Sequence, residues 1–174
     1  MLKRKFVFIL FAVFSMCAVL LNPVEGEAYI LNGQKATNPK FISYFNNSSI
    51  VKQKMEGYMN YATKWNYSGS PVKLVKCSGP FGVIITNSYS SESNGTYATT
   101  YYKTKRSSSI VYYAAFKKAS DANKKETVVH EVGHAIGLSH TQAKNNSISV
   151  MRKTKFNGKA YPLSDDKKGI NVKY

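Results

Sequence analysis

The chain is built around the stretch His130–His140, which reads HEVGHAIGLSH and gives the pattern H-E-x-x-H-x-x-G-x-x-H. Residues four apart on a helix lie nearly above one another, so His130 and His134 can direct their imidazoles to one metal ion. Gly137 can adopt positive φ and end the helix, after which the chain turns back and His140 can supply a third ligand. Three protein nitrogens leave a fourth position for water, as in a catalytic rather than a closed structural zinc site.

Glu131 follows the first histidine and lies on an adjacent face of the predicted helix. It can reach a water on the metal without occupying a coordination position, which suits a general base. A single helical histidine is most often structural, and a short HExxH occurs by chance in unrelated proteins. Here the pattern is longer, and the three histidines of the chain all lie inside it. A metal site is therefore the stronger interpretation.

Residues 1–28 have the features of a secretory signal peptide. A basic start at Lys3–Lys5 precedes an apolar run over Phe6–Leu21, and small residues up to Ala28 offer cleavage sites. An uncleaved membrane anchor is the alternative, because the apolar run approaches spanning length. We expect residues 1–28 to be a signal peptide and 29–174 to form one domain, exported from the cell, with enough residues for its own core.

The composition is strongly basic, with 25 Lys and Arg against 9 Asp and Glu and a net charge of +16. Such a protein can associate non-specifically with polyanions, including cell-wall polymers, at low salt. A solubilising surface is the stronger interpretation of the charge. The basic residues are scattered, without the aromatic-basic module of a nucleic-acid reader, so no specific nucleic-acid partner is expected. The domain has one cysteine, Cys77, which excludes an internal disulfide. A lone cysteine in an exported protein is a free thiol or an intermolecular partner, but a buried apolar role is the stronger interpretation.

Apolar periodicity predicts the element order β-α-β-β-β-α, followed by loops and a short last helix. A helix from Ile50 to Trp65 carries one buried apolar stripe. Asn123, with Glu126 three residues later, resembles a capping box for the metal helix, and Ser164 is expected to cap the last helix. The expected strands are Phe41–Phe45, Val72–Cys77, Phe81–Thr86, Thr96–Lys103 and Ile110–Phe116.

Two features outside the histidine motif point to a family. Met151 comes eleven residues after the third histidine, and the tail Leu163–Ile170 reads Leu-Ser-Asp-Asp-x-x-Gly-Ile. Together with the motif they resemble a matrixin-like metzincin, the catalytic domain of matrix-metalloproteinase-type zinc peptidases, in a minimal bacterial form. The resemblance implies an α+β, zincin-like fold: a twisted mixed five-stranded sheet with an active-site helix, a backing helix and a short C-terminal helix.

The resemblance also implies roles for individual residues. Glu131 would be the general base, and Met151 would form the Met-turn beneath the metal without binding it. One catalytic zinc ion would be held by His130, His134 and His140. An extended protein or peptide substrate would lie along an edge strand that contains Tyr97, Ala98, Thr99, Thr100 and Tyr101. The expected protein is a monomeric, secreted zinc endopeptidase.

The sequence departs from the family in four respects. No histidine remains for a second, structural zinc ion, so that site is not expected. The loop Ser90–Gly95 offers one acid, Glu92, which argues against bound calcium. The segment Lys76–Gly79 contains the domain's cysteine but lacks the flanking pattern of a thiol-switch propeptide. Arg152–Phe156 stands where the family has Pro and Tyr in the wall of the specificity pocket, so cleavage preference does not carry over.

Two other functions compete with the endopeptidase. The charge suggests a cationic secreted binding protein with an inactive zinc site, although the intact ligand set and Glu131 argue against decay. The protein could alternatively be a zinc amidase that acts on cell-wall peptides. Cleavage of denatured protein with and without a chelator tests the first alternative, and release of peptides from purified wall material tests the second.

Overall fold

The computed structural model describes residues 28–80 and 84–174. The predicted signal peptide, except for Ala28, lies outside the described residues. Within the described part of the chain, no helix is long and apolar enough to cross a membrane.

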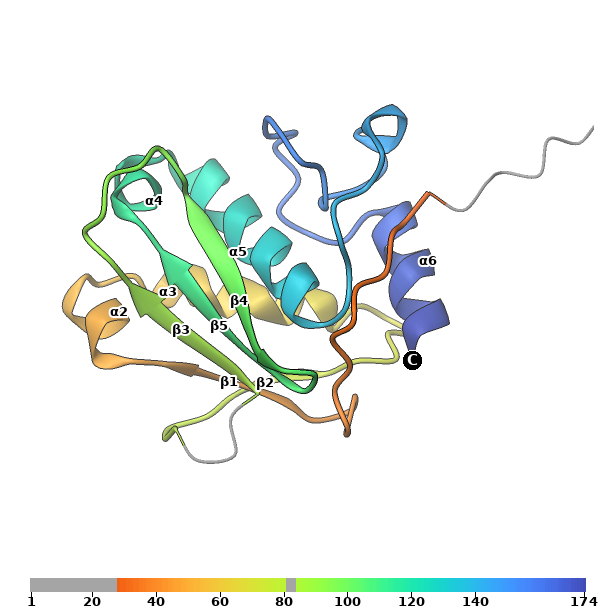
Figure 1. Ribbon diagram of the computed structural model, residues 1–174, viewed down its shortest axis with the longest axis horizontal. Coiled ribbons are helices and arrows are strands. Elements are labelled where there is room, and N and C mark those ends of the chain that lie inside the picture. Colours follow the sequence, from red (N-terminus) through yellow and green to blue (C-terminus); the bar gives the residue numbers. More distant parts are fainter. Residues whose placement is uncertain (1–27, 81–83) are drawn as a thin grey trace, which may run out of the picture.

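A five-stranded mixed sheet forms one layer of the molecule (Figure 1), with the strand order β2-β1-β3-β5-β4. The first four strands in this order run parallel to one another, and β4 pairs antiparallel with β5. β4 is therefore an edge strand. The strands are β1 (Ile42–Asn46), β2 (Leu74–Lys76), β3 (Ile85–Tyr89), β4 (Ala98–Thr104) and β5 (Ser107–Tyr112). This arrangement confirms the predicted fold class.

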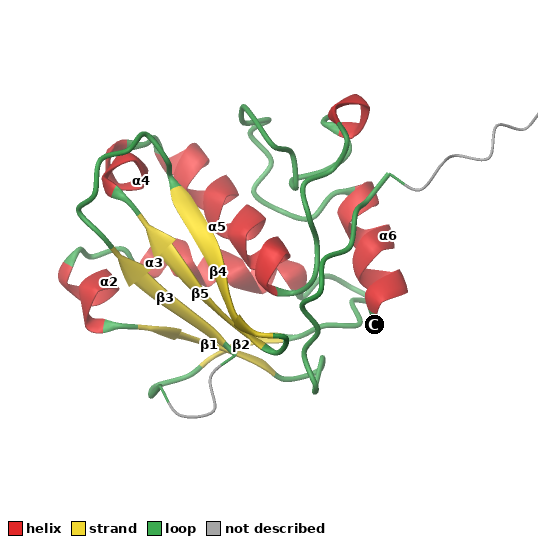
Figure 2. Cartoon of the chain, in the orientation of Figure 1, coloured by secondary structure: helices red, strands yellow, loops and turns green. Residues whose placement is uncertain are grey.

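Helix α5 (Asp121–Ala135) is the longest of the described helices and packs against the sheet (Figures 1 and 2). It lies between the strands and the loops that precede the C-terminal helix α6. The other helical elements are α2 (Ser48–Lys52), α3 (Glu56–Met59), η1 (Asn60–Trp65), α4 (Ala114–Lys118), η2 (Ala143–Asn145) and α6 (Ser164–Lys173).

The predicted continuous helix from Ile50 to Trp65 is wrong, because the segment is divided into α2, α3 and η1. Lys54 has φ of 57°, a left-handed conformation that ends the first helix. The amide of Met55 then donates to the carbonyl of Ile50. The apolar stripe nevertheless reaches the core, where Met55, Ala62 and Trp65 are buried.

Several predicted boundaries and caps also require correction. The strand predicted over Ile110–Phe116 ends at Tyr112, and α4 begins two residues later. Ser120, not Asn123, caps α5: its hydroxyl accepts a hydrogen bond from the Asn123 amide at 3.2 Å. The other strands are shifted by one to four residues, and residues 81–83 of the predicted strand Phe81–Thr86 lie outside the described part.

Trp65 joins the backing segment to the metal helix. Its side chain is fully buried, and its indole Nε1 donates to the carbonyl of Val129 at 3.0 Å. A buried tryptophan needs such an acceptor, because an unpaired indole N–H in the core costs free energy. The contact fixes α5 immediately before the first histidine of the motif.

Asp166, the second of two acids near the start of α6, holds the segment that follows the histidine motif. The Asp166 carboxylate accepts hydrogen bonds from the amides of Leu163 at 2.7 Å and Val150 at 2.8 Å, and from the Ser149 hydroxyl. The amide of Leu163 is thereby capped by Asp166, so the prediction that Ser164 caps this helix is wrong. Burial raises the pKa of Asp166 to about 6, against the lowering effect of these hydrogen bonds.

Candidate metal centre and active-site cleft

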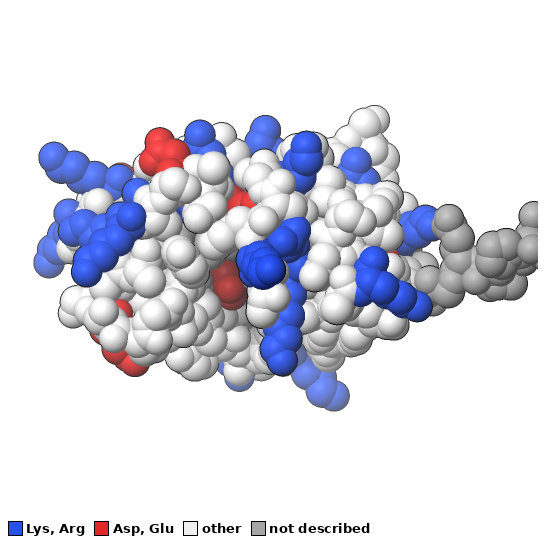
Figure 3. All heavy atoms as spheres, turned by 90° about the horizontal axis from the view of Figure 1, so that it is seen from above, with Lys and Arg blue, Asp and Glu red and all other residues white. Residues whose placement is uncertain are grey.

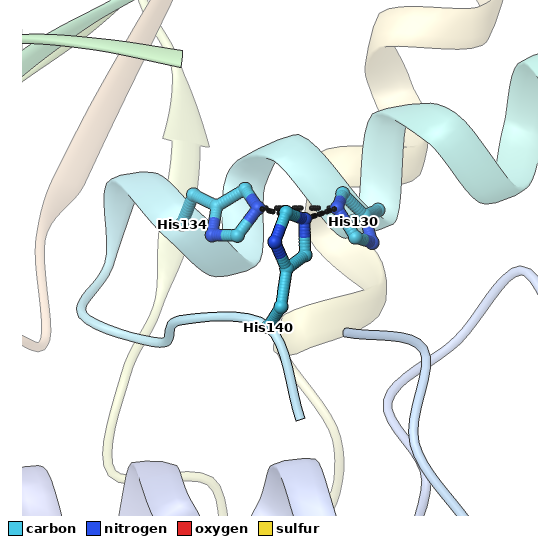
Figure 4. A group of neighbouring side chains, drawn as sticks. All are labelled: His130, His134 and His140. Carbon is cyan, nitrogen blue, oxygen red and sulfur yellow. Dashed lines mark hydrogen bonds between the residues drawn. The ribbon is translucent and has the colours of Figure 1, made fainter. Parts of the chain in front are cut away.

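Three imidazoles converge at the C-terminal part of α5 (Figure 4). The Nε2 atom of His130 lies 3.1 Å from that of His134 and 3.2 Å from that of His140, and the last two are 3.2 Å apart. Within residues 28–80 and 84–174, this is the one cluster of three or more side chains with metal-ligand chemistry.

The local backbone brings the third imidazole to the other two. α5 ends at Ala135, and Gly137 adopts φ of 120°, which turns the chain back toward the helix. A side chain is also excluded there, because a Cβ on Gly137 would lie 2.9 Å from the carbonyl oxygen of Gln34. Only glycine satisfies both conditions without strain. His140 therefore projects from the following loop toward the helical pair.

The hydrogen bonds of the ring nitrogens determine which atoms are free to bind. Nδ1 of His130 lies 2.8 Å from the carbonyl oxygen of Val150, and Nδ1 of His134 lies 2.8 Å from that of Leu138. A carbonyl only accepts, so each Nδ1 carries the proton and each Nε2 presents a lone pair. A backbone carbonyl on the second nitrogen is a common means of orienting a metal-binding histidine.

The three histidines are neutral at physiological pH. Burial, followed by the charge of the neighbouring imidazoles, lowers the pKa of His130, His134 and His140 to about 4. Lys153 adds to this effect at His140. A tetrahedral zinc ion with Zn–N bonds of about 2.0–2.1 Å separates its ligand nitrogens by roughly 3.3 Å. The observed spacing is close to that value, so these residues fit a zinc ion.

Glu131 is buried beside the histidines and receives a hydrogen bond from the edge strand. The hydroxyl of Thr100 on β4 donates to its Oε2 at 2.6 Å. Burial raises the pKa of Glu131, while the charge of His134 and the bond from Thr100 lower it. The carboxylate is therefore held in one orientation next to the imidazoles, and its proton affinity is higher than that of an exposed glutamate.

These side chains line a cleft of about 720 Å³. Its walls are formed by β4 with the residues before it, by α5, and by the segment from Val150 to Phe156. Four of the five residues predicted for the substrate strand line this cleft: Tyr97, Ala98, Thr99 and Thr100. Tyr101 is not among the lining residues, and its hydroxyl lies 2.8 Å from that of Tyr113.

Met151 is buried under the metal helix. A Cβ on Gly133 would collide with the Met151 sulfur, so the two residues are in direct contact. The carbonyl of Met151 accepts a hydrogen bond from the Thr141 amide at 2.7 Å, which ties this turn to the residue after His140. The predicted Met-turn residue thus lies beneath the histidine-bearing helix.

Asn32 supports the site, although no motif in the sequence identifies it as a site residue. Its amide group donates to the carbonyls of His134 at 3.0 Å and Leu138 at 2.8 Å. The Leu138 carbonyl also accepts from Nδ1 of His134. The backbone near Asn32 is paired as well, through a bridge between Leu31 and Leu138. The N-terminal segment therefore fixes the turn that orients one imidazole.

Glu126 is a second supporting residue that sequence reasoning did not assign to the site. It is buried at the cleft, and its carboxylate accepts hydrogen bonds from the amides of Asn157 at 3.0 Å and Gly158 at 2.8 Å. The sequence suggested instead that Glu126 forms a capping box with Asn123, one turn before the first histidine. Its contacts anchor the loop that forms the far wall of the cleft.

A mixed sheet with an antiparallel edge strand, beside a helix that carries two of three converging histidines, defines the metallopeptidase class. The family model described as Matrixin matches residues 49–174. The chain belongs to the matrixin family of peptidases, which confirms the resemblance seen in the sequence. The family implies a zinc ion, and the three histidines form a group that can hold one.

Two solved structures of myroilysin are similar to the chain. One is 14% identical with a TM-score of 0.58, and covers 83% of this chain and 97% of that one. The other is 14% identical with a TM-score of 0.57, and covers 81% of this chain and 86% of that one. At this identity the likeness concerns the fold alone. A comparison with functionally curated proteins found no match.

Proposed function

We propose that this domain is a secreted zinc endopeptidase that hydrolyses peptide bonds within proteins, with Glu131 as its general base. The observation that carries the proposal is the convergence of the three histidine Nε2 atoms beside a buried glutamate, in a cleft bounded by a free sheet edge.

The histidines would hold zinc through Nε2 of His130, His134 and His140. A zinc ion bound there supplies Lewis acidity, which lowers the pKa of water and polarises a carbonyl group. Glu131 accepts a proton from the attacking water through its carboxylate and then delivers it to the leaving amine. Its burial favours this role, because a raised pKa brings a carboxylate closer to the pH at which it exchanges protons. The Thr100 hydroxyl keeps the carboxylate directed into the cleft.

The edge strand supports the assignment to peptide substrates. The outer side of β4 pairs with no other described strand. An extended peptide can add to such an edge through main-chain hydrogen bonds, with its side chains entering pockets alternately. The open cleft along Thr96–Thr100 suits a chain that passes through, which favours an endopeptidase over an enzyme that trims chain ends.

The decisive experiment compares wild-type protein with Glu131→Gln, each purified with zinc and incubated with denatured casein. We expect one zinc per chain in both, and a loss of about 10²–10⁴-fold in hydrolysis by the variant, the usual contribution of general-base catalysis. Glu92→Gln, which changes an exposed acid in a loop, is the matched control. A chelator should abolish wild-type cleavage, and added zinc should restore it.

The possible outcomes separate the competing functions. Wild-type protein that holds zinc and cuts no protein would instead be a binding protein with an inactive site. Protein that releases peptides only from purified wall material would be an amidase. Rapid cleavage by Glu131→Gln would refute the assignment of the base.

Secretion is a separate part of the proposal and rests on the basic and apolar pattern of residues 1–28. It can be tested by expressing the full chain in a secreting host and determining the N-terminus of protein in the medium. A new N-terminus near Ala28 supports signal cleavage. Retention of Met1 on membrane-bound protein would support the uncleaved anchor.

A further inference from the structure

One wall of the cleft is formed by a cationic loop, defined here as Arg152–Phe156. Arg152, Lys153 and Lys155 all line the cleft. The acidic lining residues are Glu126 and Glu131, and both carboxylates already accept hydrogen bonds from the protein. On the face shown in Figure 3, Lys and Arg side chains far outnumber acidic ones. The charge that a bound molecule would meet along this wall is therefore positive.

The cations of this loop have no acidic partner among the described residues, where the single ion pair joins Lys76 to Glu56 at 3.7 Å. The Arg152 guanidinium instead donates to the carbonyls of Asn146 at 3.3 Å and Phe156 at 3.1 Å. Neutral acceptors satisfy its N–H groups but leave its charge uncompensated. A ligand carboxylate would supply the missing opposite charge.

The loop is held in place rather than extended freely into solvent. Asn157 and Gly158 directly follow the cationic loop, and their amides donate hydrogen bonds to the Glu126 carboxylate. The ring of Phe156 packs edge-on against Tyr97, with ring centroids 5.2 Å apart. These contacts fix the C-terminal end of the cationic loop relative to β4, so the exposed Lys153 and Lys155 are carried on a segment that is held beside the cleft.

The position of the cationic loop relative to β4 determines which part of a bound peptide lies against it. Tyr97, before β4, contacts the cationic loop, whereas Thr100 lies beside Glu131 further along the strand. Antiparallel pairing is the commoner mode in sheets. A peptide that pairs antiparallel to β4 runs toward Tyr97, so the residues after the cleaved bond lie against the cationic loop.

We propose that the cleft selects protein segments with Asp or Glu in the first few positions after the cleaved bond, recognised by Arg152, Lys153 and Lys155. This inference rests on the proposed endopeptidase function and names its substrate class. Lys153 and Lys155 are exposed and Arg152 is half-buried, so each ion pair with a substrate contributes modestly and the three act together. The expected preference is about tenfold or more in kcat/KM over a substrate with lysine at these positions, which corresponds to roughly 1.4 kcal/mol.

The test uses three fluorogenic peptides that differ only in the two residues after the cleaved bond: Asp-Glu, Ala-Ala or Lys-Lys. Wild-type protein should rank them in that order, and the preference should shrink when salt is raised from roughly 50 to 500 mM. Lys153→Glu with Lys155→Glu should reverse the order of the acidic and basic peptides. Lys73→Glu with Lys118→Glu makes the same change in net charge at exposed sites outside the cleft and should keep the wild-type order.

The outcomes keep the two proposals distinct. If the protein cleaves the Ala-Ala peptide and cleaves the Asp-Glu and Lys-Lys peptides at equal rates, the inference is overturned. The proposed endopeptidase function is then unaffected. Loss of the preference in the Lys73/Lys118 control also overturns it, because the whole surface charge would then be responsible. If the double loop variant does not fold, Lys153→Gln alone should lower the acidic-to-basic ratio by about threefold or more, and an unchanged ratio refutes the proposal. If the protein cleaves none of the three peptides and no casein, the proposed function itself is refuted.

Discussion

Gly133, which lies between His130 and His134 in the sequence, is directly against the sulfur of Met151. A Cβ at this position would collide with the sulfur and would come within 2.8 Å of Trp65 Cζ2. Trp65 is itself held by its hydrogen bond to Val129. The helix can therefore approach its support closely only because residue 133 has no side chain.

Replacing Gly133 with Ala should destabilise the protein by about 1–3 kcal/mol, as expected for overpacking a buried contact. Thermal unfolding of the metal-free protein measures the change. The control is Gly57→Ala, because no atom lies within 4 Å of a Cβ built on that helical residue. That control should be neutral or stabilising by about 0.5–1 kcal/mol. Equal melting temperatures for the two variants would contradict the close contact.

The parts of the site that depend on local geometry were predictable from the sequence. The spacing of His130 and His134 fixes their common helical face, and Gly137 marks the turn that returns His140. A strand over Thr96–Lys103 was also expected from its run of Thr and Tyr residues, whereas its position at the sheet edge was implied by the family resemblance. These features each depend on fewer than a dozen consecutive residues.

The remaining parts depend on contacts that sequence periodicity does not encode. Asn32 reaches His134 across 102 residues of the chain. The left-handed conformation of Lys54 interrupts the backing helix, and no glycine or proline at that position predicts the break. Asp166 was noted as part of the tail Leu163–Ile170, but it is buried and holds the loop at Ser149 and Val150. In each case, tertiary structure supplies the partner.

Asn32→Ala should weaken zinc binding about 10- to 100-fold, the usual effect of removing a residue that orients a metal ligand. Without its amide group, the carbonyls of His134 and Leu138 lose a donor, and the Leu138 carbonyl is the one that orients Nδ1 of His134. Competition with a chromogenic chelator measures the affinity. Asn38→Ala, at an exposed position, should bind zinc like the wild type. An affinity for Asn32→Ala within twofold of the wild type would rule out this orienting role.

Glu126→Ala should loosen the loop that forms the far wall of the cleft. It removes a charged acceptor from the amides of Asn157 and Gly158, at an expected cost of about 1–3 kcal/mol. Limited digestion with trypsin measures the local effect, since Lys153 and Lys155 are cleavage points within the loop. Glu92→Ala is the control in an exposed loop and should leave the digestion rate unchanged. Digestion of Glu126→Ala at the wild-type rate would show that the loop is held by other contacts.

The metal-free protein should lose stability as the pH falls from about 6.5 to about 4. Burial and neighbouring imidazoles lower the pKa of His130, His134 and His140 to about 4, whereas the unfolded chain protonates its histidines near 6.5. Between these values the unfolded state binds more protons, so protons favour unfolding. Below the folded pKa values both states are protonated, and this contribution levels off. Melting temperatures measured with a chelator at intervals across this range record the slope.

The triple variant His130→Gln, His134→Gln, His140→Gln isolates this contribution, because it keeps every carboxylate. Burial raises the pKa of Asp166 to about 6, so its ionisation disfavours the folded state as the pH rises, and its effect has the opposite sign to that of the histidines. Asp166 acts alike in both proteins and cancels in the comparison. The variant should therefore show a shallower loss of stability on acidification than the wild type. Identical pH profiles for the two proteins would mean that the histidines titrate normally in the folded chain and that their burial does not hold them neutral for metal binding.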